Sequence, residues 1–373
     1  MIYLDYSANT PVDPAVLSRF VETEGRFIGN PNSKHSAGRE ASAALVAATG
    51  SIAEKLHVSP AEIIYTSGAS EANNLAIKGI ARTSRHLGRH IISTPLEHAS
   101  VSGPLTWLQE QGYEIDLVDI DRSGVLDTDC LRELLRKDTV LVAVCAVDSE
   151  LGTVQPIGEI AEILQDFPNC RLHVDATQAV GKTDVVLDGV DTAAFSAHKF
   201  YGMNGSGFLF KRDSLILEPL IHGGASQSLY RSGTPTLALA RALDAALDLV
   251  VSKQSERTAI VKGHNAIVRE RLSAYSGVRI NSPENAVPHI LNISVKGVKA
   301  LDFQKALDNA GVCVSVKSAC SVDGTPSRAV LAVSRDRKNA LSSWRISLSH
   351  LTTEEEIEGF LAAFDGCFRE LYK

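Results

Sequence analysis

The sequence predicts an α/β protein with a mostly parallel central sheet, helices on both faces of that sheet, and a smaller α+β domain at the C-terminus. Short apolar segments alternate with helical segments through the first part of the chain, which is typical of a parallel sheet. After about residue 245 a long helical stretch interrupts this alternation. We therefore expect a large domain over 15–245 and a small domain over 246–373, joined by the N-terminal segment 1–14.

Each expected helix or strand is a segment in which apolar residues recur with a single period, and turn residues bound it. Strands are expected at 62–66, 90–94, 114–119, 139–147, 171–175, 192–195 and 207–211. Helices are expected between them at 71–81, 100–111 and 156–165. The C-terminal part predicts one long helix at about 238–273, a strand at 288–295, a helix at 300–309, and a last strand and helix after Ser343. Parallel sheets bind ligands at the carboxyl ends of their strands, so a site is expected there.

The charge of the chain argues against several functional classes. Its 37 basic and 44 acidic side chains give a net charge of −7, and it has no long run of lysine or arginine. Such a chain is a poor partner for nucleic acid or for a membrane surface. The longest apolar helical stretch, 237–251, is interrupted by three charged residues, so no membrane span is expected. We expect a small-molecule substrate or a protein partner.

The N-terminus and the cysteines favour a cytoplasmic setting. Residues 1–5 lack the basic and apolar regions of a signal peptide. The six cysteines are scattered and form no CxxC pair, so neither a disulfide framework nor a metal site is expected. A reducing compartment fits this cysteine usage.

Two charged residues near the ends of predicted strands indicate the chemistry. Asp175 ends the strand at 171–175, and Lys199 follows the strand at 192–195. Taken singly, such residues are more often a cap carboxylate and a surface lysine. Taken together, they match a pyridoxal phosphate enzyme, which needs a lysine for the Schiff base and a carboxylate against the pyridinium nitrogen. Nucleotide binding has little support, because neither a GxxxxGK[ST] nor a GxGxxG motif is present.

The two segments around this pair carry a family resemblance. Residues 175–182 read DATQAVGK, and residues 196–202 read SAHKFYG. Together with further ordered motifs, they make the chain similar to the class V aminotransferases, in the cysteine desulfurase branch. Those further motifs lie at 3–8, 29–35, 66–71, 97–98, 222–224, 231–234 and 318–320. The resemblance covers nearly the whole chain and implies a fold-type-I pyridoxal phosphate transferase that acts as a homodimer.

The resemblance implies a role for each residue of the cofactor site. Lys199 would form the Schiff base, Asp175 would pair with the ring nitrogen, and Gln178 would contact the ring hydroxyl. His98 would stack on the ring and move protons. The cofactor phosphate would be bound by Ala69 and Ser70 at a strand-to-helix turn, and by Ser196 and His198 directly after the strand at 192–195. Thr234 of the partner subunit would complete the phosphate site.

The resemblance also implies how the substrate would be handled. Arg345 would bind the carboxylate of L-cysteine, since a guanidinium suits bidentate carboxylate recognition. Cys320, in a polar and turn-rich segment, would take the substrate sulfur as a persulfide and leave L-alanine. The expected catalytic residues are Lys199, His98 and Cys320.

Two departures from the family pattern leave alternatives open. Asp148 and Ser149 stand where the family usually has two asparagines, the second of which contacts the ring hydroxyl and the substrate carboxylate region. The alternatives are a pyridoxal phosphate lyase or transaminase that does not use Cys320, a selenocysteine lyase, and a non-catalytic regulatory paralogue. A sulfur-acceptor protein is expected, but the sequence does not distinguish iron–sulfur cluster assembly from tRNA thiolation or cofactor biosynthesis.

Overall fold

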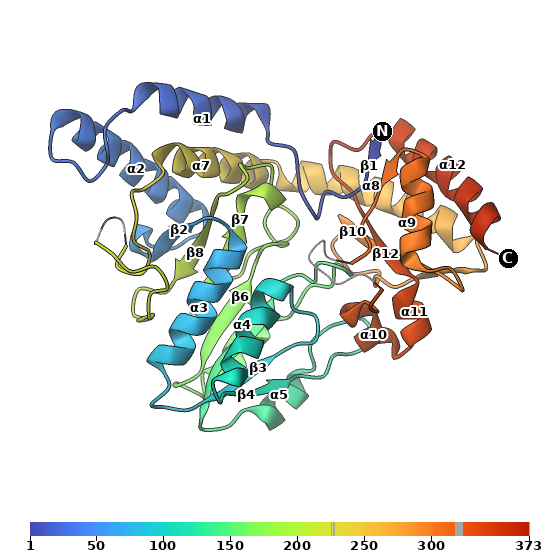
Figure 1. The fold of residues 1–373 in the computed structure, drawn as a ribbon, viewed down its shortest axis with the longest axis horizontal. Helices are drawn as coiled ribbons and strands as arrows, with labels where there is room; N and C mark the ends of the chain where they lie inside the picture. The colour runs from blue at the N-terminus through green and yellow to red at the C-terminus, as the bar shows by residue number, and fades with distance from the viewer. Residues whose placement is uncertain (225, 227, 318–323, 373) are drawn as a thin grey trace.

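The chain folds around one large sheet and one small sheet (Figure 1). The computed structural model describes residues 1–372 except 225, 227 and 318–323. None of the helices in these described ranges is long and apolar enough to cross a membrane.

The large sheet has seven strands in the order β2-β8-β7-β6-β5-β3-β4. Strand β8 runs antiparallel to both of its neighbours, and the other neighbouring pairs are parallel. The prediction of a mostly parallel sheet is therefore confirmed. The strands are β2 (Ile63–Thr66), β3 (His90–Ser93), β4 (Glu114–Leu117), β5 (Thr139–Cys145), β6 (Arg171–Asp175), β7 (Thr192–Ser196) and β8 (Gly207–Lys211).

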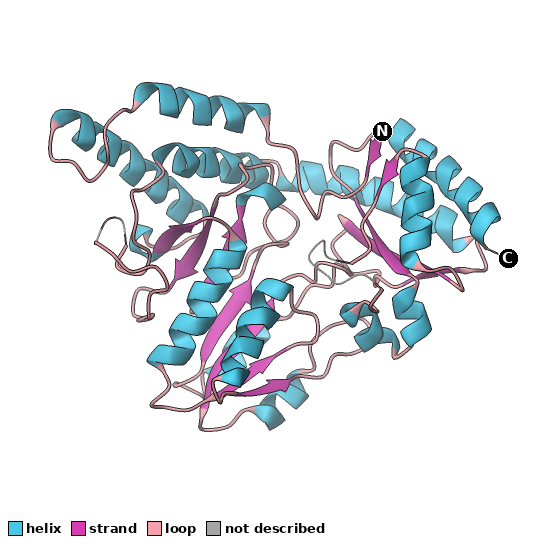
Figure 2. Cartoon of the chain, in the orientation of Figure 1, coloured by secondary structure: helices cyan, strands magenta, loops and turns pink. Residues whose placement is uncertain are grey.

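Helices cover both faces of this sheet, as predicted (Figure 2). Successive side chains of a strand point to opposite faces, so the two faces can be read from alternate residues. On β5, Leu141 and Ala143 pack in a cluster with α3 and α4, whereas Val142 and Val144 pack in a cluster with α6 and α7. The helices of this part are α1 (Pro14–Arg26), α2 (Ser36–Lys55), α3 (Ala69–Thr83), α4 (Ala99–Glu110), α5 (Thr128–Leu134), α6 (Ile157–Leu164) and α7 (Leu237–Ser252).

The small sheet is antiparallel and lies at the end of the molecule that holds both termini (Figure 1). Its central strand β10 (Ile290–Val295) pairs with β9 (Val278–Ile280) and β12 (Ser343–Ser347). Phe303 stacks on Trp344 in a separate apolar core beneath it. The accompanying helices are α8 (Gln254–Ser273), α9 (Ala300–Asn309), α10 (Arg328–Ser334), α11 (Arg337–Leu341) and α12 (Glu354–Leu371).

The N-terminal segment connects the two parts. Strand β1 (Ile2–Tyr3) pairs in parallel with β11 (Val312–Cys313), and the chain then reaches the edge of the large sheet, where the backbone N–H of Thr10 bonds to the His198 carbonyl. This route brings Ser7 and Ala8 to the carboxyl ends of the large sheet's strands. The domain boundaries at 15–245 and 246–373 stay a prediction.

The single helix expected over 238–273 is wrong. The structure has two helices, α7 and α8, which meet at Lys253. The Ser252 hydroxyl donates to the carbonyl oxygens of Asp248 and Leu249 in the last turn of α7. A serine side chain that bonds to the backbone in this way competes with continued helical hydrogen bonding. The apolar periodicity on either side continues through the break, which is why the sequence pattern did not show it.

Candidate active site

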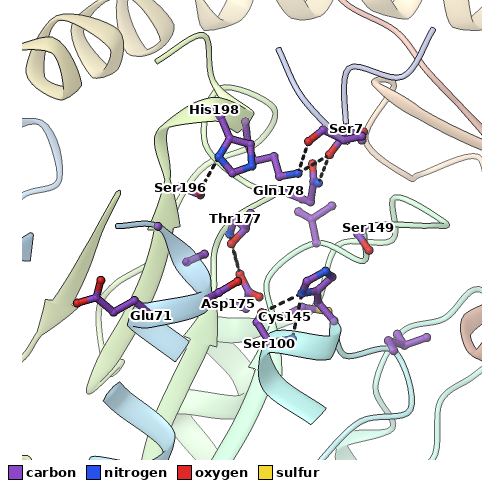
Figure 3. A pocket seen from close by; sticks show the side chains of 18 of the residues that line it. Ser7, Glu71, Ser100, Cys145, Ser149, Asp175, Thr177, Gln178, Ser196 and His198 are labelled. Atoms are coloured by element: carbon purple, nitrogen blue, oxygen red, sulfur yellow. Dashed lines mark hydrogen bonds between the residues drawn. The ribbon is translucent and has the colours of Figure 1, made fainter. Parts of the chain in front are cut away.

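A cavity of about 320 Å³ opens at the carboxyl ends of the large sheet's strands (Figure 3). Its walls include Ser67 just after β2, Cys145 at the end of β5, Asp175 at the end of β6 and Ser196 at the end of β7. The volume lies in the range of small-molecule pockets, roughly 300–1,000 Å³. The predicted site residues that line it are Ala69, Ser70, His98, Ser149, Asp175, Gln178, Ser196, His198, Lys199 and Arg345.

Asp175 is held as a hydrogen-bond acceptor on the cavity wall. Its side chain is almost fully buried, and its Oδ1 accepts the Thr177 backbone N–H at 3.0 Å and the Thr177 hydroxyl (Figure 3). Its Oδ2 accepts from the Asn73 amide at 2.9 Å. These contacts fix both carboxylate oxygens as acceptors on the cavity wall. This group can therefore face a cation inside the cavity.

The Lys199 amine lies on the same cavity, in the short 3₁₀ turn η2 (Ala197–Lys199). Its Nζ donates to the carbonyl oxygens of Ser7 at 2.9 Å and Ala8 at 2.6 Å. Gln178 Nε2 donates to the same Ser7 carbonyl at 2.9 Å, and Gln178 Oε1 accepts from Lys182. Burial, together with the nearby Lys199, lowers the pKa of Lys182 to about 7. The N-terminal segment thus orients the amine that the sequence assigns to the Schiff base.

One end of the cavity is suited to an anion. Gly68 precedes α3 at a φ of 147°, and Ala69 and Ser70 begin that helix. The first N–H groups of a helix have no intrahelical partner and favour a negative charge. Ser196 Oγ lies 3.0 Å from His198 Nδ1 on the facing wall. A Cβ on Gly68 would lie 3.2 Å from Ser196 Oγ, so glycine keeps this end of the cavity open.

His98 caps the N-terminus of α4 with its side chain. Its Nδ1 accepts the Ser100 backbone N–H at 3.1 Å and lies 2.9 Å from Ser100 Oγ. Burial lowers the pKa of His98, so the ring is favoured in its neutral form. The ring lines the cavity together with the Asp175 carboxylate.

Arg345 is fully buried, and two of its N–H groups are engaged. Its Nη2 lies 3.0 Å from Asp5 Oδ1, and its Nη1 donates to the Ser149 carbonyl at 2.7 Å. Its Nε is buried with no hydrogen-bond partner among the described residues. The guanidinium lines the cavity and is already desolvated, so it can donate to a carboxylate bound there at small further cost in desolvation.

Asp148 lies outside the cavity lining. Its Oδ1 accepts the backbone N–H groups of Glu150 and Leu151, which makes it the cap of a tight turn. Burial, and then the charge of Glu150, raise the pKa of Asp148 to about 7. Of the two departures from the family pattern, only Ser149 faces the cavity.

Behind the cavity, Glu97 is a buried carboxyl group with a raised pKa. Its Oε1 accepts from the Thr94 hydroxyl at 2.7 Å and from the Cys145 backbone N–H at 2.9 Å, whereas its Oε2 has no partner among the described residues. Burial raises the pKa of Glu97 from 4.5 to about 8. The folded protein therefore holds a proton here that the unfolded chain releases at neutral pH.

This proton makes the stability of the fold depend on pH. The stabilisation from a protonated Glu97 is complete below pH 4.5 and is lost as the pH rises through about 8. We expect the free energy of unfolding of the wild type, minus that of Glu97→Gln, to fall across this window with a slope of up to about 1.4 kcal/mol per pH unit, which corresponds to one proton. Urea unfolding from pH 5 to 8, with exposed Glu110→Gln as the control, measures this difference. A difference that is flat with pH would contradict the assignment.

One of the predicted site residues that the structure describes is not brought into this cavity. Thr234 lies in the loop before α7, outside the cavity that the described residues of one chain form. Arg231, in the same loop, lies 2.9 Å from Glu71 in the first turn of α3. Cys320 lies outside the described residues.

Other residues at the site escaped the sequence reasoning. Asn73 and Thr177 bind Asp175, Ser7 and Ala8 receive the Lys199 amine, and Asp5 pairs with Arg345. Thr177 follows Asp175 closely, in the pattern of an Asx turn, which the sequence could have indicated. The others reach the site from distant parts of the chain, and no local pattern marks them.

The fold and the site define a class of protein before any comparison is made. A buried carboxylate and a lysine amine share one cavity at the carboxyl ends of a mostly parallel sheet, with a helix start that suits an anion beside them. This arrangement is that of an α/β enzyme with a cationic ring cofactor.

The comparisons place the chain in a family. The family model described as "Aminotransferase class-V" matches residues 2–360, and the chain belongs to this family. The "NifS/IcsS protein homolog" of Lactobacillus delbrueckii subsp. bulgaricus is 36% identical and aligns with 100% of this chain and 98% of that protein. The "Cysteine desulfurase IscS" of Dictyoglomus turgidum is 36% identical over 99% of this chain and 95% of its own length. A solved structure titled "NIFS-LIKE PROTEIN" superposes with a TM-score of 0.93, at 33% identity, and covers 99% of this chain and 100% of that one.

Proposed function

We propose that the chain is a pyridoxal phosphate-dependent cysteine desulfurase, which converts L-cysteine to L-alanine and leaves the sulfur as a persulfide on Cys320. One observation carries the proposal: the Lys199 amine and the Asp175 carboxylate line the same cavity in a chain of the class V aminotransferase family. A relative called a cysteine desulfurase matches nearly the whole chain and supports the reaction.

The residues of the cavity fit pyridoxal phosphate. Lys199 supplies the amine for covalent attachment, Asp175 a carboxylate for the ring nitrogen, and Gln178 an amide for the ring hydroxyl. The phosphate fits the start of α3 at Ala69 and Ser70, with Ser196 and His198 opposite, and with Thr234 of a partner subunit completing the site. When bound, this cofactor withdraws electrons from the substrate and so acidifies its α hydrogen.

The chain's own groups handle the protons and the substrate. Lys199 is the base at the substrate α carbon, since its amine is the one that attachment of substrate would release into the cavity. His98, neutral and half-buried, is placed to exchange protons on the same cavity. Arg345 binds the substrate carboxylate, and Ser149, whose carbonyl accepts from Arg345 Nη1, lines the cavity beside it.

Cys320 performs the sulfur transfer. Its thiolate attacks the sulfur of the bound cysteine, an S–S bond forms, and the substrate C–S bond breaks. The electron pair of the broken bond stays with the substrate β carbon, which then takes a proton. The products are L-alanine and a Cys320 persulfide, with no added oxidant or reductant. An acceptor protein then removes the sulfur, for example for iron–sulfur cluster assembly.

The setting of the enzyme is part of the proposal. We propose a homodimer, because Thr234 lies outside the cavity of one chain, and a cytoplasmic location, because the five described cysteines are free thiols. Near-ultraviolet and visible absorbance of the purified protein, together with alanine release from L-cysteine, tests the function. A protein without a bound chromophore, or a coloured one that forms no alanine, would contradict it.

A substitution at Ser149 distinguishes an active cysteine desulfurase from a non-catalytic paralogue. Serine is shorter than the family's asparagine and carries no amide, so a water molecule or Gln178 contacts the ring hydroxyl in its place. We expect Ser149→Asn to change kcat/KM for L-cysteine by less than about 10-fold, the worth of one neutral hydrogen bond. Steady-state alanine formation measures this ratio, with Ser149→Ala as the matched control. A much larger gain would instead favour a non-catalytic paralogue.

A further inference from the structure

We propose that Asn73 is a positioning residue that fixes the Asp175 carboxylate and, through Ser100, the protonation of His98. The effect of Asn73 on the reaction rests on the proposed function, whereas its hydrogen bonds belong to the folded protein without cofactor. Asn73 lies in the first half of α3 with no exposed surface, and its side chain reaches across to β6 and to the start of α4.

The Asn73 amide can be oriented in only one way. Its nitrogen lies 2.9 Å from Asp175 Oδ2 and 2.9 Å from Ser100 Oγ, and its oxygen lies 2.9 Å from His173 Nε2. The reverse orientation would set the amide oxygen against a carboxylate oxygen with no hydrogen between them. The amide therefore donates one hydrogen to Asp175 and the other to Ser100.

His173 anchors the other end of the amide. Because Asn73 Oδ1 only accepts, His173 must donate from Nε2, and its Nδ1 then accepts from the Thr192 hydroxyl at 2.9 Å. Burial lowers the pKa of His173 to about 4, which agrees with a neutral ring. The hydrogen bonds that run from Thr192 through His173 and Asn73 to Asp175 thus have one hydrogen for each contact. The Asn73 amide therefore cannot turn over.

The same amide sets the hydroxyl that faces His98. Since Ser100 Oγ accepts from Asn73, the hydroxyl hydrogen is left to donate to His98 Nδ1, 2.9 Å away. The Ser100 backbone N–H donates to the same nitrogen at 3.1 Å. Neutral His98 therefore carries its proton on Nε2. It enters the reaction as a proton donor, and the first proton abstraction is left to Lys199.

Apo protein with ¹⁵N-labelled histidine tests the geometry without any turnover. Long-range ¹H–¹⁵N spectra, assigned with His98→Gln and His173→Gln, should show a protonated Nε2 and an unprotonated Nδ1 for both rings. Asn73→Leu should shift the His98 signals, because the Ser100 hydroxyl loses its fixed donor. The control Asn265→Leu also removes a buried amide, one that donates to the Pro288 carbonyl, and should leave the His98 signals in place. A proton on Nδ1 of His98, or His98 signals unmoved in Asn73→Leu, would overturn the proposal.

The dissociation constant of pyridoxal phosphate gives a second readout. Loss of a hydrogen bond to a buried carboxylate should raise it by roughly 10- to 100-fold in Asn73→Leu. Asn73→Asp keeps the size and the acceptor for His173 but loses both donors, so it should raise the constant at least as much. Asn265→Leu should lower the melting temperature without changing the constant. Unchanged affinity in a folded Asn73→Asp would refute the proposal. A wild type that binds the cofactor in this Asn73-dependent way but forms no alanine would refute the proposed function alone.

Discussion

Replacement of Lys199 by alanine is expected to abolish the covalent attachment of pyridoxal phosphate and to lower alanine formation from L-cysteine by at least about 10⁴-fold, the upper end for loss of a positioned base. In the proposed function this amine joins the cofactor and then serves as base, and the structure holds it against the Ser7 and Ala8 carbonyl oxygens on the cavity wall. Absorbance after borohydride reduction and filtration measures attachment, and amino-acid analysis measures alanine.

Lys211 provides a matched control for this prediction. It is a buried lysine at the end of β8 whose Nζ also donates to backbone carbonyl oxygens, those of Arg212, Asp213 and Leu215. Lys211→Ala should lose stability while its folded fraction keeps both the chromophore and the activity. A Lys199→Ala protein that retained reducible chromophore would show that another amine carries the cofactor.

Replacement of Cys320 by alanine is expected to leave the chromophore in place and to lower alanine formation by at least about 10³-fold, because the nucleophile that accepts the sulfur is gone. Cysteine binding should still change the visible spectrum, since Lys199, Asp175 and Arg345 are intact. Rapid-scan absorbance after mixing with L-cysteine, followed by alanine analysis, separates these two effects.

Cys313 is the natural control, because it is a half-buried thiol in β11 on the N-terminal side of the same segment. Cys313→Ala should keep the wild-type rate of alanine formation. Equal loss of activity in both variants would point to a structural effect of thiol removal. Full activity of Cys320→Ala would favour the alternative lyase or transaminase, in which this cysteine is not a nucleophile.

The sequence pattern predicts the large sheet and the cavity at the carboxyl ends of its strands, for a physical reason. Strands buried on both faces are short and apolar, as in the fully buried β5, so a charged residue at or soon after the end of a strand is conspicuous. Asp175 and Lys199 stand out in this way, and parallel strands bring such residues to one edge. Their meeting in one cavity follows from the topology.

The contacts that hold the site residues in place could not be predicted in the same way. The contacts of Asn73 with Asp175, and of Asp5 with Arg345, join residues far apart in the chain, and their side chains look like ordinary polar residues. The break between α7 and α8 was missed because the apolar pattern continues through Lys253, where the two helices meet. Local periodicity carries no information about either kind of contact.

The central claim, that sulfur passes from L-cysteine to Cys320 as alanine forms, is tested most directly by one turnover without reductant. The wild-type protein with bound pyridoxal phosphate is mixed with L-cysteine and quenched. Alanine is then quantified, and the peptide that contains Cys320 is weighed by mass spectrometry. We expect alanine and the peptide heavier by one sulfur atom to form in equal amounts. Alanine with no sulfur on that peptide, or pyruvate in its place, would contradict the account.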